Sequence, residues 1–168
     1  MIKDFKISDL KLSAKTRVQC MHGCLFYKKN QLCPPHCLDL EQFKELINSY
    51  EYIRVVYENI NYNDKEDLLK QRRHFHDKLL QEERKLKQNN VFSIAFDSGV
   101  DAMHDVVNNS DHGLGRFPIC ATGIDLQHLC AELLGISTEN MLSFWKLLLP
   151  EFLTQSKSSC LCLGCVLF

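Results

Sequence analysis

The order of hydrophobic and polar positions along the chain predicts three strands. Residues 52–60 are dense in β-branched and aromatic side chains, which favour a half-buried strand. Shorter apolar runs predict a second strand over 91–96 and a buried third strand over 160–168. Residues 1–17 hold only a short amphipathic stretch, and we interpret them as a lead-in to the domain.

Helical spacing of apolar residues predicts helices between these strands. The strongest covers about residues 65–87, where a stripe of leucine and phenylalanine runs through a charged segment. Another begins after Asp39, because Gln42 stands where it completes a capping box. Two further helices are expected, one from Asp125 to Gly135 and one over 138–149.

These elements together predict a single α+β (or α/β) domain over residues 1–168, with a small three-stranded sheet packed by helices. No repeat, low-complexity tract or linker divides the sequence. Two segments lack regular patterns, a cysteine-rich loop over 18–38 and an irregular connection over 97–123. Irregular connections as long as the second are usually functional.

Composition narrows the class of function. A net charge of −1 lacks the basic excess of a general nucleic-acid or membrane-surface binder, so we expect neither partner. The opening residues form no apolar signal segment, and the apolar run 147–149 is too short to cross a bilayer. We therefore expect a cytoplasmic protein. In that reducing compartment, nine cysteines indicate metal or redox chemistry before disulfides.

Four of these cysteines fall within eighteen positions, as Cys20-Met-His-Gly-Cys24 and Cys33-Pro-Pro-His-Cys37. Thiols gathered in one loop would repel one another once ionised, unless a cation holds them as thiolates. The glycine permits a tight turn, and the two prolines stiffen the loop, which lowers the entropy cost of gathering ligands. Buried core cysteines would be the plainer explanation, but the neighbouring His, Gly and Pro residues are typical of a loop. The pattern predicts a metal site.

The spacing also bears on the kind of metal. Zinc ribbons favour two residues between paired cysteines, whereas both pairs here are separated by three. All-thiolate coordination suits either zinc or an iron–sulfur cluster. Because wider spacing fits more easily around a cluster, we favour a [4Fe-4S] cluster, with zinc as the alternative.

The C-terminal run Cys160-x-Cys162-x-x-Cys165 offers further thiols. In a strand, Cys160 and Cys162 face one side and Cys165 the other, so one metal cannot bind all three unless Gly164 marks a bulge. We expect Cys165 to be the C-terminal candidate that reaches the N-terminal site, with Cys162 behind it. Two other cysteines, Cys120 and Cys130, are expected to be structural.

Four histidines are candidates for weaker roles. His22 and His36 lie inside the cysteine cluster and could ligate the metal or tune it by hydrogen bonding, although a solvated loop histidine is the commoner case. His104 and His112 lie in the irregular connection with nearby aspartates, a weak indication of a second metal or an acid–base role.

Three motifs give the sequence a resemblance to a known family. They are Cys20-x-x-Gly-Cys24-x-x-Tyr27-x5-Cys33-Pro-Pro followed by Leu40-Glu41, then Ala-Thr-Gly-Ile-Asp-Leu over 121–126, and the ending Cys165-Val-Leu-Phe. In this order they resemble the "predicted metal-binding protein" family, a domain of unknown function. The resemblance implies metal or iron–sulfur binding, with Cys20, Cys24, Cys33 and Cys165 as functional cysteines.

One departure from that family matters for function. Longer relatives carry a second cysteine-rich loop before the Gly-Ile-Asp segment, and the corresponding region here, roughly 98–117, contains no cysteine. An activity that needs two clusters is therefore not expected of this shortened member.

Two classes of function follow from the sequence. The first is an iron–sulfur protein in the redox or sulfur chemistry of a biosynthetic pathway, with a redox or biosynthetic protein partner. The second is a zinc-stapled interaction module without catalysis. No Ser-His-Asp or paired-carboxylate arrangement is visible, so the sequence assigns neither substrate nor reaction.

Overall fold

The computed structural model describes residues 1–22, 24, 27–28, 32–97, 115–136 and 158–168. Its centre is a four-stranded sheet in the order β1-β2-β4-β3, formed by Ile2–Lys6 (β1), Tyr52–Tyr62 (β2), Ile94–Phe96 (β3) and Ser158–Leu167 (β4). Every neighbouring pair is antiparallel, and helices pack against the sheet, so the chain has the predicted α+β architecture. The prediction of three strands was wrong by one.

The missed strand, β1, lies at an edge of the sheet. Its residues are mostly exposed, and alternating charged side chains hide the period-two pattern of a half-buried strand. It pairs with the start of β2 over its full length. Arg54 of β2 fastens it further by binding both carboxylate oxygens of Asp4, at 2.8 and 2.9 Å.

Most of the predicted helices are present where the structure describes the chain. They are α2 (Leu40–Asn48), α3 (Lys65–Gln88), and α5 (Leu126–His128), which continues as the π-helical turn η3 (Leu129–Leu134). Asp39 and Gln42 form the expected capping box, and Gly135 ends η3 in the left-handed conformation. The helix expected over 138–149 lies outside the described residues.

Three short elements were not predicted. They are the 3₁₀ turns η1 (Ile7–Asp9) and η2 (Ile119–Ala121) and the helix α1 (Ala14–Met21). Ser13 caps α1 by accepting a hydrogen bond from the Lys15 backbone N–H at 3.2 Å. Cys20 therefore lies in the last turn of a helix rather than in a loop.

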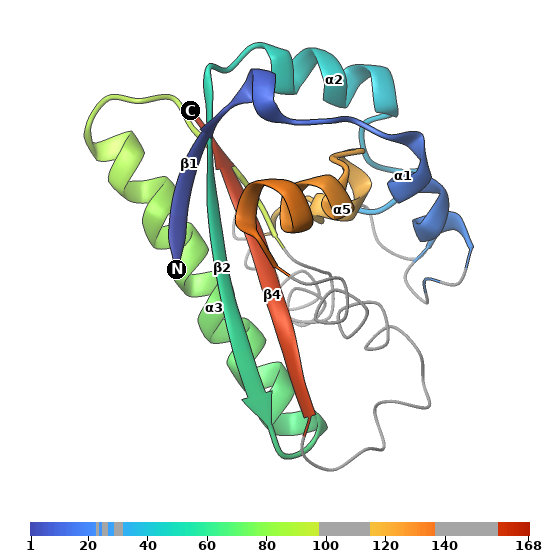
Figure 1. Cartoon of the computed structure of the whole chain (residues 1–168), viewed down its shortest axis with the longest axis vertical. Helices are drawn as coiled ribbons and strands as arrows, with labels where there is room; N and C mark the ends of the chain where they lie inside the picture. The colour runs from blue at the N-terminus through green and yellow to red at the C-terminus, as the bar shows by residue number, and fades with distance from the viewer. Residues whose placement is uncertain (23, 25–26, 29–31, 98–114, 137–157) are drawn as a thin grey trace.

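The two faces of the sheet carry different layers. The long helix α3 covers one face, and α2, η2 and α5 lie over the other (Figure 1). Along β4, Cys162 and Val166 pack under α3, whereas Leu161, Leu163, Cys165 and Leu167 pack in the opposite core. This is the alternation predicted from the sequence.

Gly164 does not mark a bulge. The register of β2 and β4 runs unbroken past it, with Val56 opposite Gly164 and Val55 opposite Cys165. A Cβ atom at position 164 would lie 2.9 Å from a methyl carbon of Leu79 on α3, and 3.1 Å from the Phe96 carbonyl oxygen. Glycine is needed here because α3 approaches the sheet closely. Cys162 and Cys165 consequently stay on opposite faces.

A buried polar network joins α3 to the edge of the sheet at β3. Nδ1 of His76 is hydrogen-bonded to Asp97, which directly follows β3, and both residues are buried. Glu83 accepts from the Arg116 guanidinium at 2.5 Å and from the Ala95 backbone N–H at 3.2 Å. These contacts fix residues 115–117 against α3, so the segment that continues into η2 has a defined position.

Candidate metal centre

Cysteines from three parts of the chain meet beside η2. Cys20 comes from α1, Cys33 and Cys37 come from the turn before α2, and Cys120 lies in the middle of η2. Cys20 donates from Sγ to the Cys120 carbonyl oxygen at 3.6 Å, and the two thiols share a side-chain hydrogen bond. All eight cysteines whose side chains the structure describes are free thiols.

The pKa of Cys120 responds to three of the four N-terminal cysteines, Cys20, Cys24 and Cys33. The hydrogen bond from Cys20, burial, and the charges of the Cys20, Cys24 and Cys33 thiolates raise the pKa of Cys120 well above its usual value. The same hydrogen bond lowers the pKa of Cys20, against burial and with help from Arg17. A negative charge at Cys20, Cys24 or Cys33 therefore disfavours a thiolate at Cys120. A bound cation would remove this repulsion.

Cys37 lies at the rim of this group, near Arg17. Its thiol donates to the Leu38 carbonyl oxygen at 3.5 Å, and Nη2 of Arg17 lies 3.9 Å from its sulfur atom. Burial raises the pKa of Cys37, and the Cys20 charge raises it further, whereas Arg17 opposes both. Cys37 is thus within electrostatic range of Cys20, and it is not among the largest causes of the Cys120 pKa shift.

Backbone hydrogen bonds shape the turn that carries Cys33. The Cys33 carbonyl oxygen accepts from the N–H groups of His36 and Cys37, at 2.9 and 3.2 Å. The Pro34 carbonyl oxygen accepts from the Lys28 N–H at 3.1 Å, which ties the two halves of the cysteine-rich segment together. Cys33 is buried by this folding, while Cys24 remains half-buried.

A short buried segment holds η2 and α1 in register. The Ile119 N–H donates to the Asp97 carbonyl oxygen at 2.7 Å, which anchors η2 to the end of β3. On the other side, the Ser13 N–H donates to the Gly123 carbonyl oxygen at 2.7 Å, and Leu12 forms a β-bridge with Ile124. Cys20 and Cys120 meet because both are positioned from residues 117–125.

The structure places the other cysteine candidates in the core. Cys165 is completely buried on β4, and its pKa is raised well above the usual value by burial and by the Cys130 charge, with no N-terminal cysteine among the causes. Cys162 is buried on the opposite face, under α3. Neither is brought to the Cys20–Cys120 pair by a contact that the structure describes.

The histidine candidates are at the periphery where the structure describes them. His22 is the exposed C-cap of α1, and its N–H donates to the Val18 carbonyl oxygen at 3.0 Å. His36 is exposed, and its Nε2 lies 3.4 Å from the Lys28 carbonyl oxygen. His104 and His112 lie outside the described residues.

The donor set fits a soft metal centre. Four thiols with no carboxylate among them are the ligands that zinc and iron–sulfur clusters take. Around one zinc ion they would stand about 3.8 Å apart, as follows from a Zn–S distance of about 2.3 Å. Within the part of the chain that the structure describes, no three His, Cys, Asp or Glu side chains are grouped as a single ion would need.

Sequence reasoning expected Cys120 to be structural, and its place beside Cys20 makes it a further candidate ligand. One sequence feature could have made Cys120 a candidate. It lies one residue before the segment 121–126 that resembles the family motif. Periodicity could not reveal it, because its partners lie about a hundred residues away in the sequence and meet it only through the fold.

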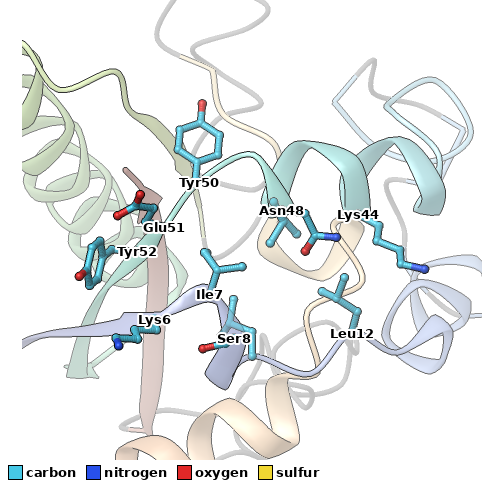
Figure 2. Close-up of a pocket in the computed structure, with 11 residues that line it drawn as sticks. Lys6, Ile7, Ser8, Leu12, Lys44, Asn48, Tyr50, Glu51 and Tyr52 are labelled. Carbon is cyan, nitrogen blue, oxygen red and sulfur yellow. The ribbon is translucent and has the colours of Figure 1, made fainter.

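A separate hollow of about 650 Å³ lies between β1, η1, α2 and the start of β2. Figure 2 shows an apolar floor that includes Ile7 and Leu12, with Lys6 and Lys44 at opposite ends. Charged groups that do not converge give the hollow no evident ligand chemistry.

Among the residues that the structure describes, no helix is long and apolar enough to cross a membrane.

Comparisons with known proteins identify one family. A family model described as "Predicted metal-binding protein (DUF2284)" matches residues 3–149, which is most of the chain. Neither the curated proteins nor the solved structures contain a significant match.

Proposed function

The chain belongs to the DUF2284 family of predicted metal-binding proteins, and on that premise we propose that it holds one [4Fe-4S] cluster on Cys20, Cys24, Cys33 and Cys120. The observation that carries this proposal is the grouping of these four thiols, in which charges at the first three act on Cys120. Cys37, at the rim, is the candidate to replace one of them. Cys165 is the remaining candidate from the sequence, and its burial beside Cys130 argues for a structural role.

The spacing of the thiols supports a cluster over a single ion. The two N-terminal pairs are each separated by three residues, which is wider than the two residues between paired cysteines of zinc ribbons. The thiols are close enough to influence each other's pKa values. Thiolates that bind the four corners of a cluster stand farther apart than those around one ion, so the wider sequence spacing favours a cluster.

Such a centre would serve redox or sulfur chemistry. A cluster held by four thiolates exchanges single electrons at a potential set by its charge, hydrogen bonds and exposure. Here the half-buried Cys24 gives a path toward the surface, while Cys20 and Cys33 are buried. We infer a protein partner that exchanges electrons or sulfur with this face, in a biosynthetic pathway and in the cytoplasm.

A second function, a zinc-stapled interaction module, is favoured by one observation. The cysteines come from α1, the turn before α2 and η2, so a metal bound to them would join three separate segments. That is how structural zinc stabilises small domains. In this case the metal would hold the fold, and partners would bind elsewhere.

Anaerobic purification of the full chain with absorbance and elemental analysis tests the proposal. A [4Fe-4S] protein should be brown, with a broad absorbance band at about 400 nm and about four irons per chain. The triple Cys20, Cys24 and Cys33 to Ser variant should lose both. Colourless protein with one zinc would refute the cluster and establish the structural module.

Single substitutions test the ligand set. Cys120→Ser should lose metal, whereas Cys130→Ser is a matched control because Cys130 is a buried cysteine that interacts with Cys165. Cys37→Ser separates the alternatives for the fourth ligand. Full metal content in Cys120→Ser together with loss in Cys37→Ser would contradict the assignment of Cys120.

A further inference from the structure

One guanidinium joins the three segments that carry Cys20, Cys37 and Cys120. Arg17 lies on α1, three residues before Cys20, so the two side chains lie on the same side of the helix. Its Nη1 donates to the Leu38 carbonyl oxygen at 2.7 Å and to the Ala121 carbonyl oxygen at 3.1 Å. Leu38 directly follows Cys37, and Ala121 directly follows Cys120.

From this geometry we propose that Arg17 is the positioning residue of the thiolate site, which gathers the cysteines before metal binds and balances their charge. The inference rests on the proposed function, because it concerns the same site. Without Arg17, the carbonyl groups beside Cys37 and Cys120 lose the donor that joins them to α1. The turn before α2 is then joined less firmly to α1 and η2 before metal binds.

The shape of arginine explains why this residue type stands here. A guanidinium is planar and carries five N–H donors in a fixed arrangement, so it bonds two carbonyl groups and faces a sulfur atom at once. Its carbon lies 6.0 Å from the centre of the Phe43 ring, a contact that holds the group on the core side. A lysine at this position would supply the charge but only a point contact.

The charge of Arg17 is directed at the cysteines. Nη2 of Arg17 lies 3.9 Å from the Cys37 sulfur atom. Within the described part of the chain, Arg17 forms no ion pair with a carboxylate, whereas Arg54 is bound by both Asp4 and Glu82. Arg17 therefore offsets part of the negative charge that four thiolates bring to the site.

Zn²⁺ affinity measured on the full chain tests this role. Competition with a chromophoric chelator in reducing buffer should show a 10–100-fold weaker affinity for Arg17→Gln, the range found when groups that orient metal ligands are removed. Arg17→Lys keeps the charge and should fall between the two. Arg54→Gln is the matched control and should stay within about twofold, because its partners lie on β1 and α3.

A second probe keeps the inference independent of the metal. Phenylarsine oxide bridges two thiols, so its affinity for metal-free protein reports how well they are gathered. Arg17→Gln should weaken this binding by at least fivefold, with Arg54→Gln unchanged. If the parent chain bound no Zn²⁺ and no iron, the proposed function would fail, but weaker arsenical binding in Arg17→Gln would still support the positioning role.

Two results would overturn the proposal. One is an Arg17→Gln variant whose affinities for both probes stay within twofold of the parent. The other is an equal weakening in Arg17→Gln and Arg54→Gln, which would indicate general loss of stability. Arg17→Lys supplies the comparison if Arg17→Gln does not fold, since it must then bind both probes more weakly than the parent chain.

Discussion

Replacing Gly123 by alanine tests the scaffold of the thiolate site. Gly123 has a φ of +84°, a conformation that alanine adopts only with strain. A Cβ atom there would also lie 2.3 Å from Cδ1 of Leu40, the first residue of α2. Because the Gly123 carbonyl oxygen accepts from Ser13 at 2.7 Å, any shift of this residue is passed to α1 and Cys20.

The cost of the backbone conformation and the cost of the overlap with Leu40 can be estimated separately. The backbone conformation costs about 1–2 kcal/mol for alanine, and forcing a methyl group into a filled space costs about 1–3 kcal/mol. Gly123→Ala should therefore lower the free energy of unfolding by about 2–5 kcal/mol. Gly135→Ala is the matched control, since Gly135 has a φ of +67° with no atom within 4 Å of its Cβ position. It should lose only about 1–2 kcal/mol.

Urea unfolding followed by circular dichroism, with a chelator and a reductant present, measures these differences. In a Leu40→Ala background the overlap disappears, so the loss caused by Gly123→Ala should fall to that of Gly135→Ala. Equal losses for the two glycine variants in the parent background would refute the argument, because they would show that contact with Leu40 has no cost.

Two further predictions follow from the pKa shifts. Burial raises the pKa of Cys130 to about 11, so at pH 8 its thiolate fraction is about a hundredfold lower than that of an ordinary thiol. In metal-free protein, iodoacetamide labelling read by peptide mass spectrometry should therefore modify Cys24 before Cys130, and equal rates would contradict this. Burial alone would raise the pKa of Glu83, but Arg116 and Lys87 hold it below the usual value of 4.5. Its stabilising effect is then present above that value and is lost as pH falls through the folded-state pKa. Glu83→Gln should accordingly be less stable than the parent near pH 7, with the two urea midpoints converging toward pH 3, and a constant difference across this range would contradict the reasoning.

The elements with strong local signals were predictable from the sequence. The capping box of Asp39 and Gln42, the 24-residue helix α3 and the left-handed Gly135 all depend on neighbouring residues, and all are present. The alternation along β4 was also predictable, because two sheet faces impose a period of two whatever packs on them.

The elements that were missed depend on distant partners. β1 is an exposed edge strand stabilised by β2 and Arg54, so its own residues carry little strand signal. α1 is short and two of its apolar side chains, Val18 and Met21, are exposed, and it is held by contacts to Leu38 and Ala121 through Arg17. The sequence left open a bulge at Gly164, and the structure shows another reason for the glycine, the approach of Leu79 from a helix that precedes it by more than seventy residues.

The candidate site also contains residues with a local sequence signal and one residue that depends on distant partners. Cys20, Cys24 and Cys33 were predicted because their spacing is local, whereas Cys120 became a candidate only when the fold brought η2 to the end of α1. Its hydrogen bond to Cys20 spans a hundred residues of sequence, and no periodic pattern records such a contact.

The segment 117–125 explains how such distant cysteines form one site. Its backbone is fixed at one end by Asp97, at the end of β3, and at the other by the chain leading into α1, through Leu12 and Ser13. Most of its residues are buried, and the Thr122 hydroxyl both donates to the Ile119 carbonyl oxygen at 2.7 Å and accepts from the Ile124 N–H. This turn determines the positions of both cysteines. Cys120 is positioned by the hydrogen bonds to Asp97 at the end of β3, and Cys20 is positioned because the chain that leads into α1 binds the same turn. We therefore expect the Gly-Ile-Asp motif to set where the proposed ligands stand, so a change at Gly123 should weaken metal binding as well as the fold.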